Sequence, residues 1–250
     1  MTTLLSLDSF TFTDTNIIPL LTSYQLIPQL LGEQILDREI ATIQCSPEEI
    51  AQAVTSFYQF WGLTEETQQL AWQQRYRLST EQLEAMATRK LRIEKYKENR
   101  WGAIVPSYFF KRKGYLDRVI YSWMRLTDEG VAHELYFRLV EGEQSFDELA
   151  RRYAQGSEAI TGGLVGPVEI GTLPENFAYL LKGCTVGQIN LPVRLGQHWV
   201  IMRLEQRISV ELDQAMHKRL LQEQFELWFR SEMEKLSGEE KTWLGLPTPQ

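Results

Sequence analysis

The sequence predicts an α+β protein with a helical N-terminal domain, a small and mostly antiparallel sheet with flanking helices, and a C-terminal helix that packs back on the N-terminal helices. Three observations support this prediction. Apolar residues recur at helical spacing from about residue 16 to residue 113, β-branched and aromatic residues dominate positions 119–124, and a long amphipathic pattern fills positions 212–236. We expect domains at residues 1–115, 116–208 and 209–250, the last being the C-terminal helix and tail.

Several helices account for the first domain. Residues 17–43 have helical apolar spacing that Pro28 should kink or divide, because proline disrupts a helix interior. Ser46 and Ser79 each precede a glutamate or glutamine by three residues, which is the capping-box spacing that begins a helix. Thr64 opens a shorter helix, and residues 106–113 form another. We interpret the aromatic side chains of this domain as core, with a ligand cage as the alternative, including Tyr58, Trp61 and Trp72.

The second domain begins where the pattern changes, at Gly114. A strand over residues 119–124 is followed by a helix from residue 127 and by a second helix that the Ser145 capping box begins. A glycine-bearing segment at 156–171 and a short helix near 176–181 come next. A short strand ends at Val193, and residues 198–204 form a strand that is apolar enough to be buried on both faces. The predicted order is β-α-α-β-α-β-β.

The last element is one long helix over residues 212–236 with two apolar stripes, which indicates a helix wedged between neighbours. At 100° per residue the first stripe contains Leu212, Met216, Leu220 and Leu227, and the second contains Leu221, Phe225, Trp228 and Phe229.

Composition narrows the function classes. The net charge of −7 argues against nucleic acid as the main partner, because such binding rests on neutralising phosphates. A basic stretch over residues 89–113 favours a solvated helix face, with an anionic docking surface as the open alternative. No apolar run reaches the length of a membrane span, and the first residues lack the pattern of a secretory signal, so we expect a cytoplasmic protein. Three histidines and two distant cysteines indicate neither a metal centre nor a disulfide, and we expect no cofactor.

The segment from residue 146 to residue 204 carries a recognisable series of motifs. A helix over 146–153 leads to Gly162-Gly163, then to Gly171-Thr172-Leu173 and Phe177, then to Val186-Gly187-Gln188 and Pro192-Val193, and finally to a strand that opens with His198. Taken in this order, the motifs resemble the parvulin family of peptidyl-prolyl isomerases over about residues 116–207. The helical flanks resemble the parvulin chaperones of the SurA and PrsA type.

The resemblance implies a site. Leu173 and Phe177 would form an apolar cup for the proline ring, whereas packing in a plain core is the alternative interpretation. His198 matches the second histidine of the family, and a buried structural histidine is the alternative. Tyr121 stands where the family has its first histidine and could hydrogen-bond His198. Gly156 stands where the family has cysteine or aspartate, with Ser157 or Glu158 as nearby substitutes.

The implied function is a peptidyl-prolyl cis-trans isomerase and folding chaperone that acts on Xaa-Pro bonds of unfolded or precursor polypeptides. The alternative is a weak or inactive parvulin that serves as a non-enzymatic chaperone or targeting factor, because Tyr121 and Gly156 replace polar family residues. Isomerase activity on a short prolyl peptide separates the two hypotheses. The sequence leaves the oligomeric state open.

Overall fold

The computed structural model describes residues 3–7, 10–13 and 15–236. The described chain separates into two compact units. The helical unit comprises the residues up to Val105 and those from His217 on, and the sheet unit comprises Pro106–Met216. The boundaries that we predicted after residues 115 and 208 stay predictions.

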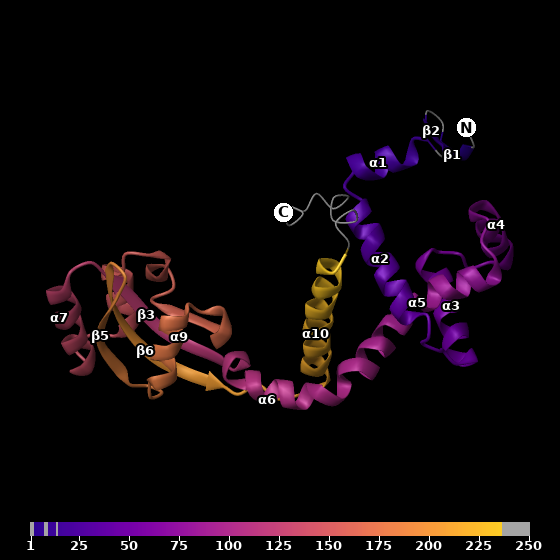
Figure 1. Ribbon diagram of the computed structural model, residues 1–250. Coiled ribbons are helices and arrows are strands. Elements are labelled where there is room, and N and C mark those ends of the chain that lie inside the picture. Colours follow the sequence, from indigo (N-terminus) through magenta and orange to yellow (C-terminus); the bar gives the residue numbers. More distant parts are fainter. Residues whose placement is uncertain (1–2, 8–9, 14, 237–250) are drawn as a thin grey trace. The chain divides into compact units, whose positions relative to one another are not determined.

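The helical unit contains a short antiparallel β1–β2 pair and the helices of the N-terminal half of the chain (Figure 1). Capping boxes at Ser46 and Ser79 begin α3 and α5, as predicted. Pro28 lies in the first turn of α2, so the helical segment is interrupted before the proline rather than after it. The cap of α4 is Glu65 and not Thr64, which corrects that prediction. The elements are β1 Thr3–Leu7, β2 Phe10–Thr13, α1 Ile17–Ser23, α2 Ile27–Ile40, α3 Pro47–Phe60, α4 Glu66–Tyr76, α5 Thr80–Trp101 and a 3-10 turn at Gly102–Ile104.

Helix α10, Gln214–Glu234, packs on α5 and α2, as predicted for the C-terminal helix. The ring centroids of Tyr96 and Trp228 lie 5.4 Å apart, and those of Trp101 and Phe225 lie 6.3 Å apart. A Cβ atom at Gly32 of α2 would lie 2.7 Å from the Phe229 ring, so a larger residue there would force this ring to shift. Aromatic packing of this kind adds to the apolar burial that holds a helix in place.

One residue of the predicted stripes is placed differently. Met216 and Leu220 are buried, as is Leu221 of the other stripe, but Leu227 is 54% exposed. The first stripe is therefore not buried as far as Leu227. In this part of α10, the aromatic side chains of the second stripe make the contacts with α5 and α2.

The sheet unit contains one four-stranded antiparallel sheet in the order β4-β3-β6-β5, with helices on both faces (Figure 1). The predicted β-α-α-β-α-β-β order is confirmed. Two bounds differ: α6 continues through Gly114 to Leu116, and the strand predicted to end at Val193 continues to Leu195. The elements are α6 Val105–Leu116, β3 Arg118–Leu126, α7 Glu129–Val140, α8 Phe146–Tyr153, β4 Leu164–Glu169, α9 Glu175–Gly183, β5 Ile189–Leu195 and β6 His198–Ile208, with 3-10 turns at Ser157–Ala159 and Ile170–Thr172.

The two faces of this sheet bury separate cores, because alternate residues of a strand point to opposite faces. On the α9 face, Val119 and Tyr121 of β3 pack with Phe177 and Leu181 of α9. On the opposite face, Met124 packs with α7 and α8. The central strand β6 is buried on both faces, as its apolar sequence predicted: Val200, Ile201, Met202 and Leu204 are each at most 1% exposed.

Candidate functional site

A pocket of about 470 Å³ opens on the α9 face of the sheet unit. Its walls include all four residues that the resemblance pointed to, namely Tyr121, Leu173, Phe177 and His198. The two aromatic residues belong to β3 and α9, Leu173 precedes α9, and His198 opens β6. The remaining wall residues are Trp123, Arg125, Pro174, Asn176, Leu195, Gly196 and Val200.

Three aromatic rings form the floor of this pocket. Phe177 is 5% exposed, and its ring centroid lies 5.1 Å from that of Tyr121 and 5.2 Å from that of Trp123. The first pair meets at an interplanar angle of 68°, which is the edge-to-face contact that aromatic quadrupoles favour. Leu173 is half-buried and packs against the same core, so part of its side chain faces the open pocket. The arrangement therefore offers a preformed apolar hollow.

His198 is held at the pocket rim by a tight hairpin. It pairs directly with Leu195, and only Gly196 and Gln197 separate β5 from β6. Gly196 has a φ of 62°, a left-handed conformation that glycine adopts without strain. This short turn fixes His198 opposite Leu195 at the start of β6.

The hydrogen bond that we expected between Tyr121 and His198 is absent from the described part of the chain. The Nδ1 atom of His198 is buried without a partner there, and the Tyr121 hydroxyl contacts no donor or acceptor among the described residues. Burial raises the pKa of the Tyr121 phenol, so the side chain is neutral near pH 7. Tyr121 therefore contributes its ring to the pocket, and His198 lines the pocket while its Nδ1 atom stays buried.

An ion pair fills the space beside Gly156. Nε and Nη2 of Arg125 donate to the two carboxylate oxygens of Glu158 at 2.9 and 2.7 Å, and the Glu158 side chain is only 2% exposed. A Cβ atom at Gly156 would lie 1.8 Å from Nη2 of Arg125. Glycine at this position thus leaves room for the guanidinium, which also lies 4.9 Å above the Trp123 ring.

This pairing sets the charge state of both partners. Burial alone raises the pKa of the Glu158 carboxyl, but the hydrogen bonds and positive charge of Arg125, with backbone donors, outweigh burial and lower that pKa overall. The hydrogen bond to Glu158 raises the pKa of Arg125. Glu158 is one of the two substitutes considered for the missing family residue. It does not line the pocket, and it acts there only by holding the Arg125 guanidinium.

The second glycine of the Gly162-Gly163 motif brings β3 and β4 together. Gly163 has a φ of 84°, and a Cβ atom there would lie 2.7 Å from the backbone oxygen of Trp123. The Trp123 amide donates to the Gly163 carbonyl oxygen at 3.0 Å. A side chain at Gly163 would therefore push β3, with its two pocket aromatics, away from this loop.

Sequence reasoning missed Trp123 and Arg125 as pocket residues. The signal was present, because residues 121, 123 and 125 share one face of a strand. A register irregularity between Ile120 and Tyr121 shifts the earlier residues of β3, but it leaves this alternation intact.

At least five of the nine basic residues in the stretch over residues 89–113 form ion pairs within the chain. Arg89 pairs with Asp37, Lys95 with Glu49, and Lys113 with Asp117, while Lys97 and Arg100 pair with Glu94 and Glu39. These internal pairs neutralise part of the positive charge that an anionic partner would meet. The interpretation of this stretch as a solvated helix face stays a prediction.

Two further properties concern the described residues alone. They contain no group of three or more His, Cys, Asp or Glu side chains that could hold a metal ion. None of their helices combines the length and the apolar character that crossing a bilayer requires.

Comparison with known proteins agrees with this geometry. Residues 129–206 match the Rotamase family, described as the PPIC-type PPIASE domain. The chain is 29% identical over 109 residues to the chaperone SurA of Pseudomonas aeruginosa, and 30% identical over 117 residues to that of Alkalilimnicola ehrlichii. These alignments cover 42% of this chain but only 26% and 27% of the relatives, so the chain spans about a quarter of their length.

The crystal structure of the peptidylprolyl isomerase PrsA from Bacillus cereus has the same fold. It aligns with a TM-score of 0.50 at 18% identity and covers 96% of this chain and 95% of the other. The expected resemblance to parvulins with a helical domain of the SurA and PrsA type is confirmed.

Proposed function

We propose that this protein is a parvulin-type peptidyl-prolyl cis-trans isomerase with folding-chaperone character, acting on Xaa-Pro bonds of unfolded or precursor polypeptides. The pocket carries this proposal, because it unites Leu173, Phe177 and His198 within the segment that matches the PPIC-type domain. The names of the SurA relatives support the chaperone role. The cytoplasmic location stays a prediction.

The chemistry suits an apolar pocket. Rotation about a prolyl bond meets a barrier of about 20 kcal/mol, because twisting removes the amide resonance. No covalent bond breaks, so catalysis requires that the pocket bind the twisted amide more tightly than either planar form. Leu173 and Phe177 pack against the pyrrolidine ring and exclude water from it. A twisted amide carries less charge separation than a planar one. It therefore loses less hydration free energy when it leaves water.

Polar groups at the rim orient the peptide. The His198 ring lines the pocket and can contact a peptide group there, although its Nδ1 atom is itself buried. Arg125 is about one-third exposed, so its guanidinium can reach the chain next to the proline while Glu158 holds it. We propose Tyr121 as a wall of the cup through its ring, and we propose His198 as the group that contacts the peptide backbone.

A protease-coupled assay on a short Xaa-Pro peptide tests the proposal. The wild type should accelerate isomerisation, and Phe177→Ala should lose most of the acceleration because it opens the floor of the pocket. Phe177→Leu keeps an apolar floor and serves as the control for folding. Wild-type rates at the uncatalysed level, together with suppression of client aggregation, would instead select the non-enzymatic chaperone.

A further inference from the structure

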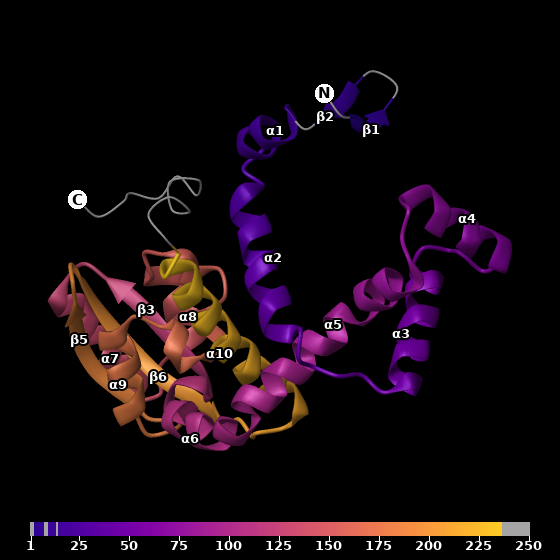
Figure 2. The same ribbon diagram turned by 45° about the vertical axis from the view of Figure 1, so that its right-hand side comes forward.

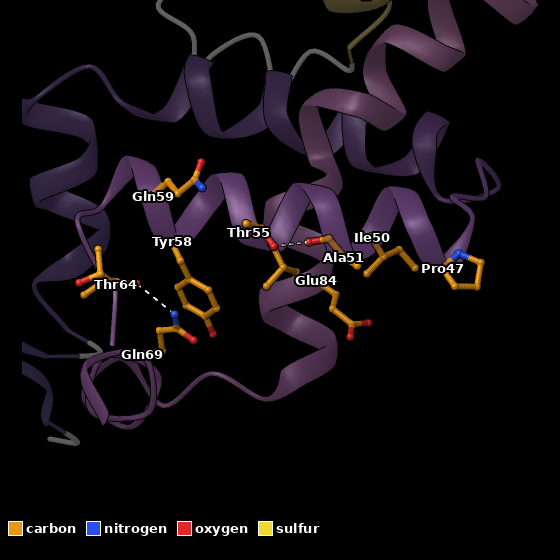
Figure 3. A pocket seen from close by; sticks show the side chains of 11 residues that line it. Pro47, Ile50, Ala51, Thr55, Tyr58, Gln59, Thr64, Gln69 and Glu84 are labelled. Carbon is orange, nitrogen blue, oxygen red and sulfur yellow. Dashed lines mark hydrogen bonds between the residues drawn. The ribbon is translucent and has the colours of Figure 1, made fainter. Parts of the chain in front are cut away.

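A second and larger hollow lies in the helical unit. Helices α3 and α4 and the first turns of α5 enclose a groove of about 750 Å³. Its apolar wall is one face of α3, with Ile50, Val54 and Tyr58 at helical spacing. Gln69 comes from α4 and Glu84 from α5, and Figure 3 shows the Tyr58 and Gln69 side chains directed toward one another.

The aromatic residues around this groove are not core, contrary to our interpretation of the sequence. Neither α3 nor α4 has a single buried residue. Trp61 is 53% exposed, Phe60 is 83% exposed, and Tyr58 and Trp72 are half-buried. The Trp72 centroid lies 5.3 Å from that of Phe57, so the rings form a contiguous surface beside the groove. Exposed apolar surface of this extent marks interaction sites.

The groove also contains a carboxylate without a partner. The side chain of Glu84 accepts no hydrogen bond and forms no ion pair within the part of the chain that the structure describes. Two other polar groups of the groove are satisfied internally: Thr55 Oγ1 donates to the Ala51 carbonyl at 2.9 Å, and Gln69 Nε2 donates to the Leu63 carbonyl at 3.0 Å (Figure 3). Glu84 is thus the charged group that a ligand would meet.

The surrounding charge has the same sign. Residues 46–84 contain six glutamates and two arginines, and of these glutamates Glu49 is paired with Lys95. An anionic field of this kind attracts cationic segments and repels anionic ones. A second copy of this chain, with a net charge of −7, is a poor occupant for the same reason.

We propose that this groove binds an extended polypeptide segment in which one lysine or arginine lies among apolar residues. The apolar side chains pack against Ile50, Val54 and Tyr58, and the cation pairs with Glu84. This site needs no proline, and it is independent of the prolyl pocket. The protein would therefore hold a basic, apolar stretch of a polypeptide in one unit, whether or not the other unit acts on it.

Fluorescence anisotropy with the full-length protein tests this proposal. The probe is a labelled, proline-free peptide of twelve residues with one central arginine among leucine, alanine and serine. Glu84→Gln should raise the Kd about threefold, which is the range of a partly exposed ion pair. The same variant should leave the Kd of a matched peptide with glutamine in place of arginine unchanged. Glu84→Arg should reverse the preference, so that a peptide with central glutamate binds better than the arginine peptide.

Three controls separate the possible outcomes. Glu81 lies one turn earlier on α5 and outside the groove. Glu81→Gln should therefore leave the Kd of each peptide unchanged. Leu173→Ala in the prolyl pocket should also leave the Kd of each peptide unchanged. Peptide binding in the groove is therefore tested separately from isomerase activity. Equal effects of Glu84→Gln and Glu81→Gln would overturn the proposal, because only nonspecific charge would be acting. Light scattering that shows a dimer which Glu84→Arg abolishes would also overturn it, since the groove would then be an interface between copies.

Discussion

Substitution of Leu173 by alanine probes the prolyl pocket with little risk to the fold. The side chain is half-buried at the pocket edge, and alanine removes three carbon atoms. Each buried methylene contributes about 0.8 kcal/mol, and a proline ring covers about half of the lost surface, so transition-state binding should weaken by about 1–2 kcal/mol. We expect kcat/KM for an Xaa-Pro peptide to fall about fivefold to thirtyfold, because about 1.4 kcal/mol corresponds to a factor of ten.

Leu191→Ala is the matched control for this substitution. Leu191 lies on β5, is 60% exposed, and does not line the pocket. Its removal should leave kcat/KM unchanged in the same protease-coupled assay, with thermal unfolding measured in parallel to show that both variants fold. Equal rates for the two variants, at comparable stability, would refute the assignment of Leu173 to the proline cup.

Two further predictions concern the polar groups near the pocket. Glu158→Gln should lower the free energy of unfolding at pH 7 by about 1–3 kcal/mol, because Arg125 loses its buried partner but stays partly solvated. The pKa of Glu158 is lowered in the folded state, so this carboxylate stabilises the fold above its unfolded pKa of about 4.3, and the stabilisation is lost as pH falls through the folded pKa. Chemical denaturation below about pH 5 should therefore show that the free energy of unfolding depends less on pH in Glu158→Gln than in the wild type. Equal pH dependence in the two proteins would contradict the pairing. Tyr121→Phe should keep kcat/KM within about twofold and stability within about 0.5 kcal/mol, because the hydroxyl has no partner among the described residues. A loss of tenfold or more in peptide assays would show that the hydroxyl acts on the substrate.

Local signals in the sequence predicted most of the fold. Serine caps fixed the starts of α3, α5 and α8, because a cap requires one short polar side chain at a defined spacing. The apolar run that became β6 indicated burial on both faces, and the structure confirms it. Helix ends were less predictable: α6 runs through Gly114, since a single glycine weakens a helix by only about 1 kcal/mol.

The site was predictable only in part. The motif order pointed to Leu173, Phe177 and His198, and the structure brings them together with Tyr121. Sequence alone could not show that Glu158 pairs with Arg125, because the two are distant in the chain and meet only when the loop before Gly162-Gly163 folds over β3. Nor could helical spacing separate a core stripe from an exposed one, and the aromatic residues of α3 and α4 were therefore misjudged as core.

The most direct test of the central claim is two-dimensional exchange NMR on a peptide with a single Xaa-Pro bond. The proposed pocket predicts exchange cross-peaks between the cis and trans signals at substoichiometric wild-type protein, on a timescale at which the free peptide shows none. Phe177→Leu should retain the cross-peaks, and Phe177→Ala should lose them. Peptide signals that broaden or shift on binding, without any cis-trans exchange, would contradict the claim that the pocket catalyses rotation.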